Sequence, residues 1–115
     1  MKNRDTDERV IRNIREFAEF DGRYVTVVGK YRSIPKPRKG ISSEDAPKDH
    51  ATLILDDGAN IFIEPIDSPK SIRSTEERNQ FEARKVYVRG IAHKIMPSSG
   101  QSLINPCISD ITSIS

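Results

Sequence analysis

The feature that most constrains this fold is a pattern that occurs twice, with alternating valines followed by a glycine. It reads VTVVG over residues 25–29 and VYVRG over residues 86–90. Alternation with a period of two predicts β-strands. A glycine inside a strand permits a bulge or sharp bend, because it has no side chain to pack. The pattern therefore predicts two long strands that bend at Gly29 and Gly90, so that each can leave one sheet and join another.

The choice of apolar residues also favours strands. The chain holds 15 Ile and 6 Val but only 3 Leu, and branching at Cβ suits pleated, half-buried surfaces better than helices. With 115 residues, one compact domain is expected.

The first 22 residues predict an amphipathic helix that precedes a domain over residues 23–115. Asp5 or Thr6 is the expected cap, and Asp21-Gly22 ends the helix. The apolar residues that recur at the spacing of one helical face are Val10, Ile11, Ile14, Phe17 and Ala18.

The rest of the chain predicts strands, a long proline-containing loop and a second helix. Ser74 and Glu77 have the spacing of a capping box, so a short helix is expected from Ser74 to about Ala83, with Phe81 as its apolar anchor. The expected strands and loop are strand Tyr24–Ser33, loop Ser33–His50, hairpin Ala51–Pro65, strand Lys85–Ile95 and strand Ser102–Ile114.

The hairpin around Asp57-Gly58 allows two registers. A two-residue turn would put Ile54, Ile61 and Ile63 on one face. A three-residue turn with a left-handed Gly58 would instead give an apolar face and a mixed face. We favour the second register, in which Leu53, Leu55, Ile61 and Ile63 face the core and Ile54, Asn60, Phe62 and Glu64 lie opposite.

The final segment is ambiguous between strand and helix. Ile108, Ile111 and Ile114 are three residues apart, but the Thr and Ser residues between them favour a bulged strand. Pro106 is expected to interrupt the segment, because proline cannot donate to a central ladder.

The order of elements over Tyr24–Ile114 resembles an OB-fold, a five-stranded Greek-key barrel with a helix between its third and fourth strands. The two glycine patterns lie where an OB-fold needs its long strands to curl. We therefore expect an all-β, OB-like barrel, with a β-sandwich or an open sheet as the alternatives.

Charge is unevenly distributed over the expected loop. Residues 23–40 hold six cations and no acid, whereas residues 41–58 hold five acids and one lysine. In nucleic-acid-binding members of the resembled fold, this loop and the face of strands two and three form the groove. Pro35 and Pro37 would keep the loop backbone extended. The residues expected to contact single-stranded DNA or RNA are Arg32, Lys36, Arg38 and Lys39 through phosphates, Phe62 and Tyr31 through stacking, and Arg89.

A protein partner or self-association is the competing expectation, because Ile54 and Phe62 would be neighbours on an exposed face and the N-terminal helix adds an apolar stripe. The net charge of +2 is below the strongly basic footprint of dedicated nucleic-acid domains. Tyr31 and Tyr87 can point either way from their strands.

Catalysis, metal binding and cofactors are not expected. The sequence has no phosphate-binding glycine loop or nucleophile elbow, and His50, His93 and Cys107 are too far apart for the short spacing of a zinc site. Asp56 and Asp57 are explained as turn formers. The single cysteine and a start without the apolar segment of a secretory signal predict a cytoplasmic protein. No run approaches the roughly 18 apolar residues that a membrane span needs, so no membrane association is expected.

Overall fold

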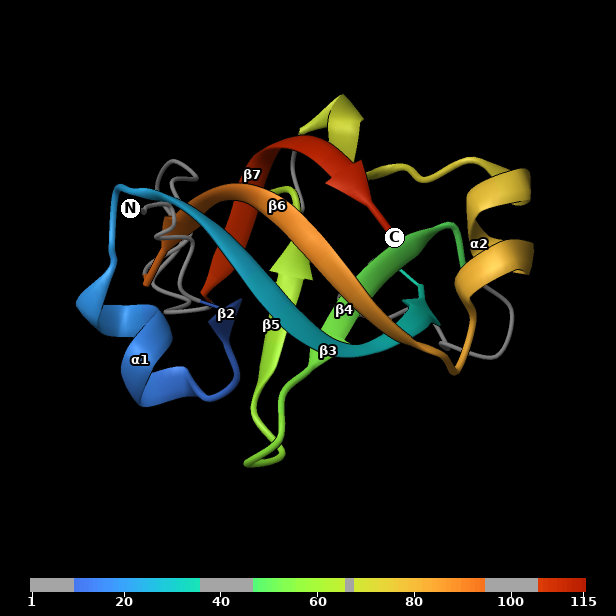
Figure 1. The fold of residues 1–115 in the computed structure, drawn as a ribbon. Helices are drawn as coiled ribbons and strands as arrows, with labels where there is room; N and C mark the ends of the chain where they lie inside the picture. Colours follow the sequence, from blue (N-terminus) through green and yellow to red (C-terminus); the bar gives the residue numbers. More distant parts are fainter. Residues whose placement is uncertain (1–9, 36–46, 66–67, 95–105) are drawn as a thin grey trace, which may run out of the picture.

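The computed structural model describes residues 10–35, 47–65, 68–94 and 106–115, and these residues form a closed five-stranded β-barrel (Figure 1). Around the barrel the order is β3, β4, β5, β7 and β6, and β6 pairs with β3 to close it. The strands are β3 (Tyr24–Ile34), β4 (His50–Ile54), β5 (Asn60–Ile63), β6 (Lys85–His93) and β7 (Cys107–Ile114).

The strand order confirms the predicted all-β class and the OB-like arrangement. The neighbours β6, β3, β4 and β5 are the fourth, first, second and third barrel strands, which is the order of a Greek key. Strands β5 and β7 run parallel, and the other barrel pairs are antiparallel.

The two glycine patterns pair with each other. Val27 lies opposite Val88, and each glycine lies opposite a valine of the other segment, Gly29 with Val86 and Gly90 with Val25. A Cβ at Gly29 would lie 2.7 Å from the Ile54 carbonyl oxygen, and one at Gly90 would lie 2.5 Å from that of Ser109.

The predicted change of partner strand is confirmed at Gly29, whereas Gly90 lies at a shift of register with β6 keeping both of its partners. Strand β3 changes its partner from β6 to β4 next to Gly29, and the ladder between β6 and β7 shifts register between Arg89 and Ile91. Each glycine is needed because another backbone crosses against it, and a side chain there would prevent the close approach.

The favoured hairpin register is confirmed. Thr52 pairs with Phe62 and Leu53 with Ile61, the N–H of Leu55 donates to the Ala59 carbonyl, and Gly58 has φ +85°. The four residues predicted to face the core, Leu53, Leu55, Ile61 and Ile63, are all buried. Glu64 from the opposite face is also buried, which was not predicted.

The N-terminal helix differs from the prediction. Val10 and Ile11 form the short strand β2 (Val10–Ile11), which runs parallel to β3, and helix α1 spans only Ile14–Glu19. Asn13 caps it, since its Oδ1 accepts from the N–H of Glu16 at 2.9 Å. The predicted caps Asp5 and Thr6 lie outside the described residues. Because Val10 and Ile11 are β-branched and an edge of β3 is open to them, they pair as a strand although their spacing also fits a helix.

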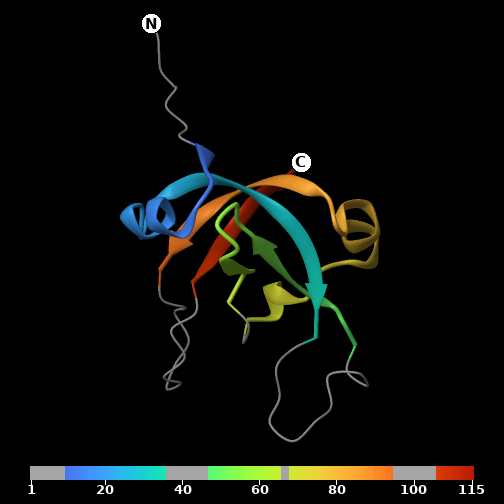
Figure 2. The same cartoon turned by 90° about the horizontal axis from the view of Figure 1, so that it is seen from below.

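The two helices lie at opposite ends of the barrel (Figures 1 and 2). Phe17 of α1 is completely buried in the core, together with Ile11, so residues on both sides of the predicted boundary at residue 22 share one core. The second helix, α2 (Thr75–Phe81), begins after the predicted cap Ser74, whose Oγ accepts from the N–H of Glu77. Its anchor Phe81 packs against the core, and the short 3₁₀ helix η1 (Pro69–Ser71) precedes it.

The last segment is a bulged strand, as favoured. Asp110 has φ +52° within β7, and Pro106 lies immediately before the strand, where its carbonyl accepts from the N–H of Phe62.

Candidate nucleic-acid interface

Two rows of side chains cross the outer surface of β3, β4 and β5. In the first row Arg32 pairs with Thr52 and Thr52 with Phe62. In the second row Lys30 pairs with Ile54 and Ile54 with Asn60. We call this surface the β3–β5 face, and its residues are Lys30, Arg32, Thr52, Ile54, Asn60 and Phe62.

The β3–β5 face is cationic and partly apolar. Lys30, Arg32 and Asn60 are exposed, and Phe62 and Ile54 are half-buried. Thr52, which lies between Arg32 and Phe62, is buried. Residues 30–34, 50–54 and 60–63 include no Asp or Glu. A surface with two cations beside an accessible aromatic ring can attract phosphates and offer one ring for stacking.

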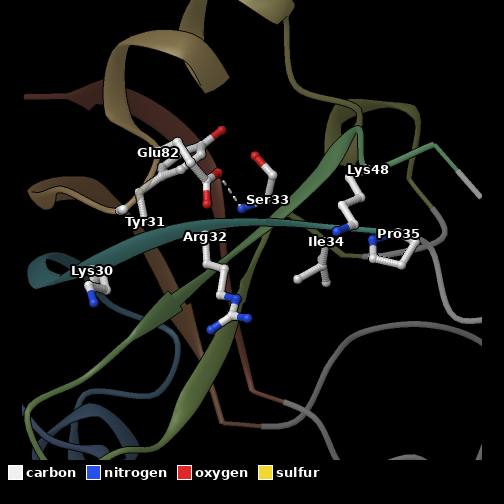
Figure 3. A pocket seen from close by; sticks show the side chains of 9 residues that line it. Lys30, Tyr31, Arg32, Ser33, Ile34, Pro35, Lys48 and Glu82 are labelled. Atoms are coloured by element: carbon white, nitrogen blue, oxygen red, sulfur yellow. Dashed lines mark hydrogen bonds between the residues drawn. The ribbon is translucent and has the colours of Figure 1, made fainter. Parts of the chain in front are cut away.

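A hollow of about 800 Å³ runs along the last part of β3, lined by residues 30–35 together with Lys48, Glu82 and Ala83 (Figure 3). Arg32 lies on the opposite side of β3 from Tyr31 and Glu82. The Glu82 carboxylate accepts a hydrogen bond of 2.8 Å from the N–H of Ser33. The lining thus holds three cations, Lys30, Arg32 and Lys48, against one carboxylate that binds the strand itself.

Tyr31 does not belong to the β3–β5 face, so its predicted stacking role is wrong. Its side chain is completely buried in the core, because Tyr31 alternates with the outward-facing Lys30 and Arg32 along β3. Its ring centroid lies 6.1 Å from that of Phe81. Its hydroxyl donates to Glu77 Oε2 at 2.7 Å. Burial, followed by this hydrogen bond, raises the pKa of the Tyr31 phenol.

The other predicted residues are divided between two places. Arg89 is exposed on β6, opposite Thr26 of β3. It is therefore not on the β3–β5 face, since β3 lies between β6 and β4. Lys36, Arg38 and Lys39 lie outside the described residues, and their proposed phosphate contacts stay a prediction.

The sequence did not predict a polar cluster of Tyr31, Arg73 and Glu77, which joins α2 to β3. Glu77 accepts from Arg73 Nε at 2.8 Å and from Arg73 Nη2 at 2.9 Å, in addition to Tyr31. Burial alone would raise the pKa of Glu77, but the hydrogen bonds from Arg73 and Tyr31 outweigh it and the pKa is lowered. The capping-box spacing indicated the helix, but the Glu77 side chain also binds Tyr31 of the barrel and Arg73 of the segment that leads into the helix.

A serine, a histidine and an aspartate also lie in contact. Ser71 Oγ is 2.9 Å from His50 Nδ1, and His50 Nε2 is 3.4 Å from Asp49 Oδ1. Ser71 is 1 % exposed, and its hydroxyl donates to the Ser68 carbonyl at 2.8 Å. Two hydrogen bonds thus hold the buried hydroxyl, one with the His50 ring and one with the Ser68 carbonyl. The contact therefore fastens η1 to the start of β4.

The side chain of Glu64 binds the bulge in β7. It has φ +69° and is 3 % exposed. Its two carboxylate oxygens accept from the N–H groups of Asp110 and Ile111 at 3.3 and 3.2 Å. These backbone donors are offered to Glu64 by the bulge, so the buried carboxylate is satisfied.

Within the part of the chain that the structure describes, no group of three or more His, Cys, Asp or Glu side chains could hold a metal ion. His93 is on β6, with its Nε2 2.7 Å from Ser109 Oγ. Neither of the described helices has the length or apolar character to cross a membrane.

Comparison with protein-family models, curated proteins and solved structures found no match for this chain.

Proposed function

We propose that this chain is a non-catalytic, cytoplasmic binding module of the OB-fold type that binds single-stranded nucleic acid across the β3–β5 face. The observation that carries the proposal is the row formed by Arg32, Thr52 and Phe62. It puts a guanidinium and an aromatic ring on one outer surface, two strands apart. Strands are about 4.8 Å apart, so the backbones of Arg32 and Phe62 are about 10 Å apart along the row, a span that one nucleotide chain can cover.

Each residue has a distinct role in the proposal. Arg32 and Lys30 bind phosphates, and Phe62 stacks on a base. Lys36, Arg38 and Lys39 add phosphate contacts from the segment that follows β3. The carboxylate-free surface supports this assignment, because an acidic side chain among these cations would repel the phosphates.

Titration of labelled oligo-dT and oligo-U at two salt concentrations tests the proposal. Arg32→Ala should weaken binding and lower the salt slope by about 0.7, the value for one lost single-strand phosphate contact. Phe62→Leu should weaken binding by about 1 to 3 kcal/mol with the slope unchanged, because stacking releases no counterions. Arg15→Ala is the matched control, since Arg15 is exposed on α1. Absence of binding by the unchanged protein at low salt would reject the proposal.

A protein partner is the second candidate, supported by the half-buried pair Ile54 and Phe62 on the same face. The N-terminal helix does not support it, because Phe17 packs in the barrel's own core. Phe62→Asp should disrupt a complex or oligomer and leave the thermal unfolding of the barrel unchanged. A monomeric wild-type protein at high concentration with no captured partner counts against this candidate.

A further inference from the structure

Two lysines face each other on the outer surface of the barrel. Lys30 of β3 and Lys85 of β6 are the last cross-strand partners of the antiparallel ladder between these strands, and both are exposed. Like charges directly opposite each other destabilise a sheet. Among the described residues neither lysine forms an ion pair that would relieve the repulsion. An anion bound between the two ammonium groups would relieve it.

An exposed aromatic ring lies beside this pair. Tyr87 is two residues beyond Lys85 on β6 and two residues before Arg89, so all three share the outer side of the strand. We call Lys85, Tyr87 and Arg89 the β6 stripe. Tyr87 is 40 % exposed and Tyr24 on the neighbouring β3 is 53 % exposed. These are the two exposed aromatic side chains among the described residues, and both lie on the β3–β6 side of the barrel.

The stripe is continuous with the β3–β5 face. Lys30 has Lys85 as its partner on one side and Ile54 on the other, so one row runs from β6 through β3 and β4 to Asn60 on β5. Three strand separations of about 4.8 Å make this row roughly 14 Å long. The exposed positions 85, 87 and 89 on β6 and 24, 30 and 32 on β3 include no acidic residue.

We propose that the nucleic acid crosses β3 between Lys30 and Lys85 and continues onto the β6 stripe, with a phosphate between the two lysines and a base stacked on Tyr87. This inference rests on the proposed function and extends its site to the fourth barrel strand. Cations interleaved with an aromatic ring are the combination by which proteins bind single strands without reading their sequence.

Lys85→Gln distinguishes a binding role from a structural one, because it should move stability and affinity in opposite directions. Removing one of two repelling charges should raise the thermal unfolding temperature of the free protein. The same change should weaken binding of a 15-nucleotide oligo-dT and lower the salt slope by about 0.7. Lys94→Gln is the matched control, since Lys94 is exposed just after β6 and should leave affinity unchanged.

Tyr87→Leu tests the stacking contact. It should weaken binding of the same oligonucleotide by about 5- to 150-fold, and photo-crosslinking of a bromouracil-substituted strand should label the peptide that contains Tyr87. If the unchanged protein binds no oligonucleotide at low salt, the proposed function itself fails. If Arg32→Ala weakens binding and Lys85→Gln and Tyr87→Leu do not, only this inference is overturned. Binding of poly-glutamate in place of oligonucleotides through the same residues would overturn it as well and assign the stripe to an acidic protein partner.

Discussion

Tyr31 of β3 donates its phenolic hydrogen to Glu77 of α2 across 2.7 Å, from a ring that is completely buried in the barrel. Glu77 also accepts two hydrogen bonds from Arg73, which precedes the helix. One carboxylate therefore joins the barrel core, the helix and the segment that leads into the helix. This cluster closes the end of the barrel that lies next to the hollow along β3.

Glu77→Gln should destabilise the protein by about 2 kcal/mol, because it removes charged hydrogen bonds that are only partly exposed to water. The side chains of Arg73 and Glu77 are 15 % and 17 % exposed, so solvent screens the pair only in part. Urea unfolding measures the change. Glu76→Gln on the exposed side of the same helix should be nearly neutral, and equal effects of the two variants would contradict the assignment.

Glu77 should also make the free energy of unfolding depend on pH. The pKa of Glu77 is lowered from its ordinary 4.5, so the folded state binds this proton less readily than the unfolded state. Its contribution is complete above pH 4.5 and is lost as the pH falls through the lower folded value. Unfolding temperatures between pH 6 and pH 3 should fall more steeply for the wild type than for Glu77→Gln, and parallel curves would refute the prediction.

Gly29→Ala and Gly90→Ala should each destabilise the barrel by about 2 to 3 kcal/mol, because the new methyl group would collide with a carbonyl oxygen of the crossing strand. Gly22→Ala is a useful comparison. Gly22 has φ +83°, and a Cβ added there would have no atom within 4 Å, so this variant should lose only about 1 kcal/mol from backbone strain. Chemical denaturation measures all three, and a tolerated alanine at position 29 or 90 would contradict the crossing geometry.

Asp57→Ala should lower the unfolding temperature by loosening α1. The Asp57 carboxylate accepts from the N–H of Ile14 at 3.1 Å and from that of Ala59 at 3.2 Å, and the bond from Ile14 is the main reason that the pKa of Asp57 is lowered. Amide exchange at Ile14 should accelerate in this variant. Asp56→Ala, in the same turn, should leave that exchange rate unchanged; acceleration in both variants would assign the effect to the turn alone.

Cys107 should resist thiol reagents in the folded protein. Its side chain is buried, and burial, with a smaller effect of Glu64, raises the pKa of the thiol to about 12. Very little thiolate, the reactive form, is present at pH 8. Labelling with a disulfide reagent should be slow in buffer and fast in denaturant, whereas rapid labelling of the folded chain would contradict the assignment.

Local chemistry was sufficient to predict several parts of the fold. Asp57-Gly58 and the alternating apolar residues around it predicted the hairpin register, because only the three-residue turn gives a consistently apolar face. Ser74 and Glu77 predicted where α2 begins. The repeated glycine pattern predicted bent strands. The pairing of its two copies with each other could be seen only in the tertiary structure.

The features that could not be predicted depend on contacts between distant parts of the chain. Val10 and Ile11 fit a helical face by spacing and form a strand because β3 offers them a free edge. Whether the Tyr31 side chain points into the barrel or away from it depends on which face of β3 meets the core. Burial of Glu64 depends on donors in β7, more than forty residues away in sequence. The β3–β5 face was predicted in outline, whereas its continuity with the β6 stripe follows only from the pairing of Lys30 with Lys85.

Strand β2 has an effect beyond its two residues. Thr26 and Val27 have β6 on one side and β2 on the other, and β4 joins β3 only from Lys30 onward. A chain shortened to begin at Arg12 would leave amide and carbonyl groups unsatisfied along that stretch, and such bare edges recruit strands from other molecules. Strand β2 therefore covers a stretch of β3 on which a second copy of the chain could otherwise add a strand.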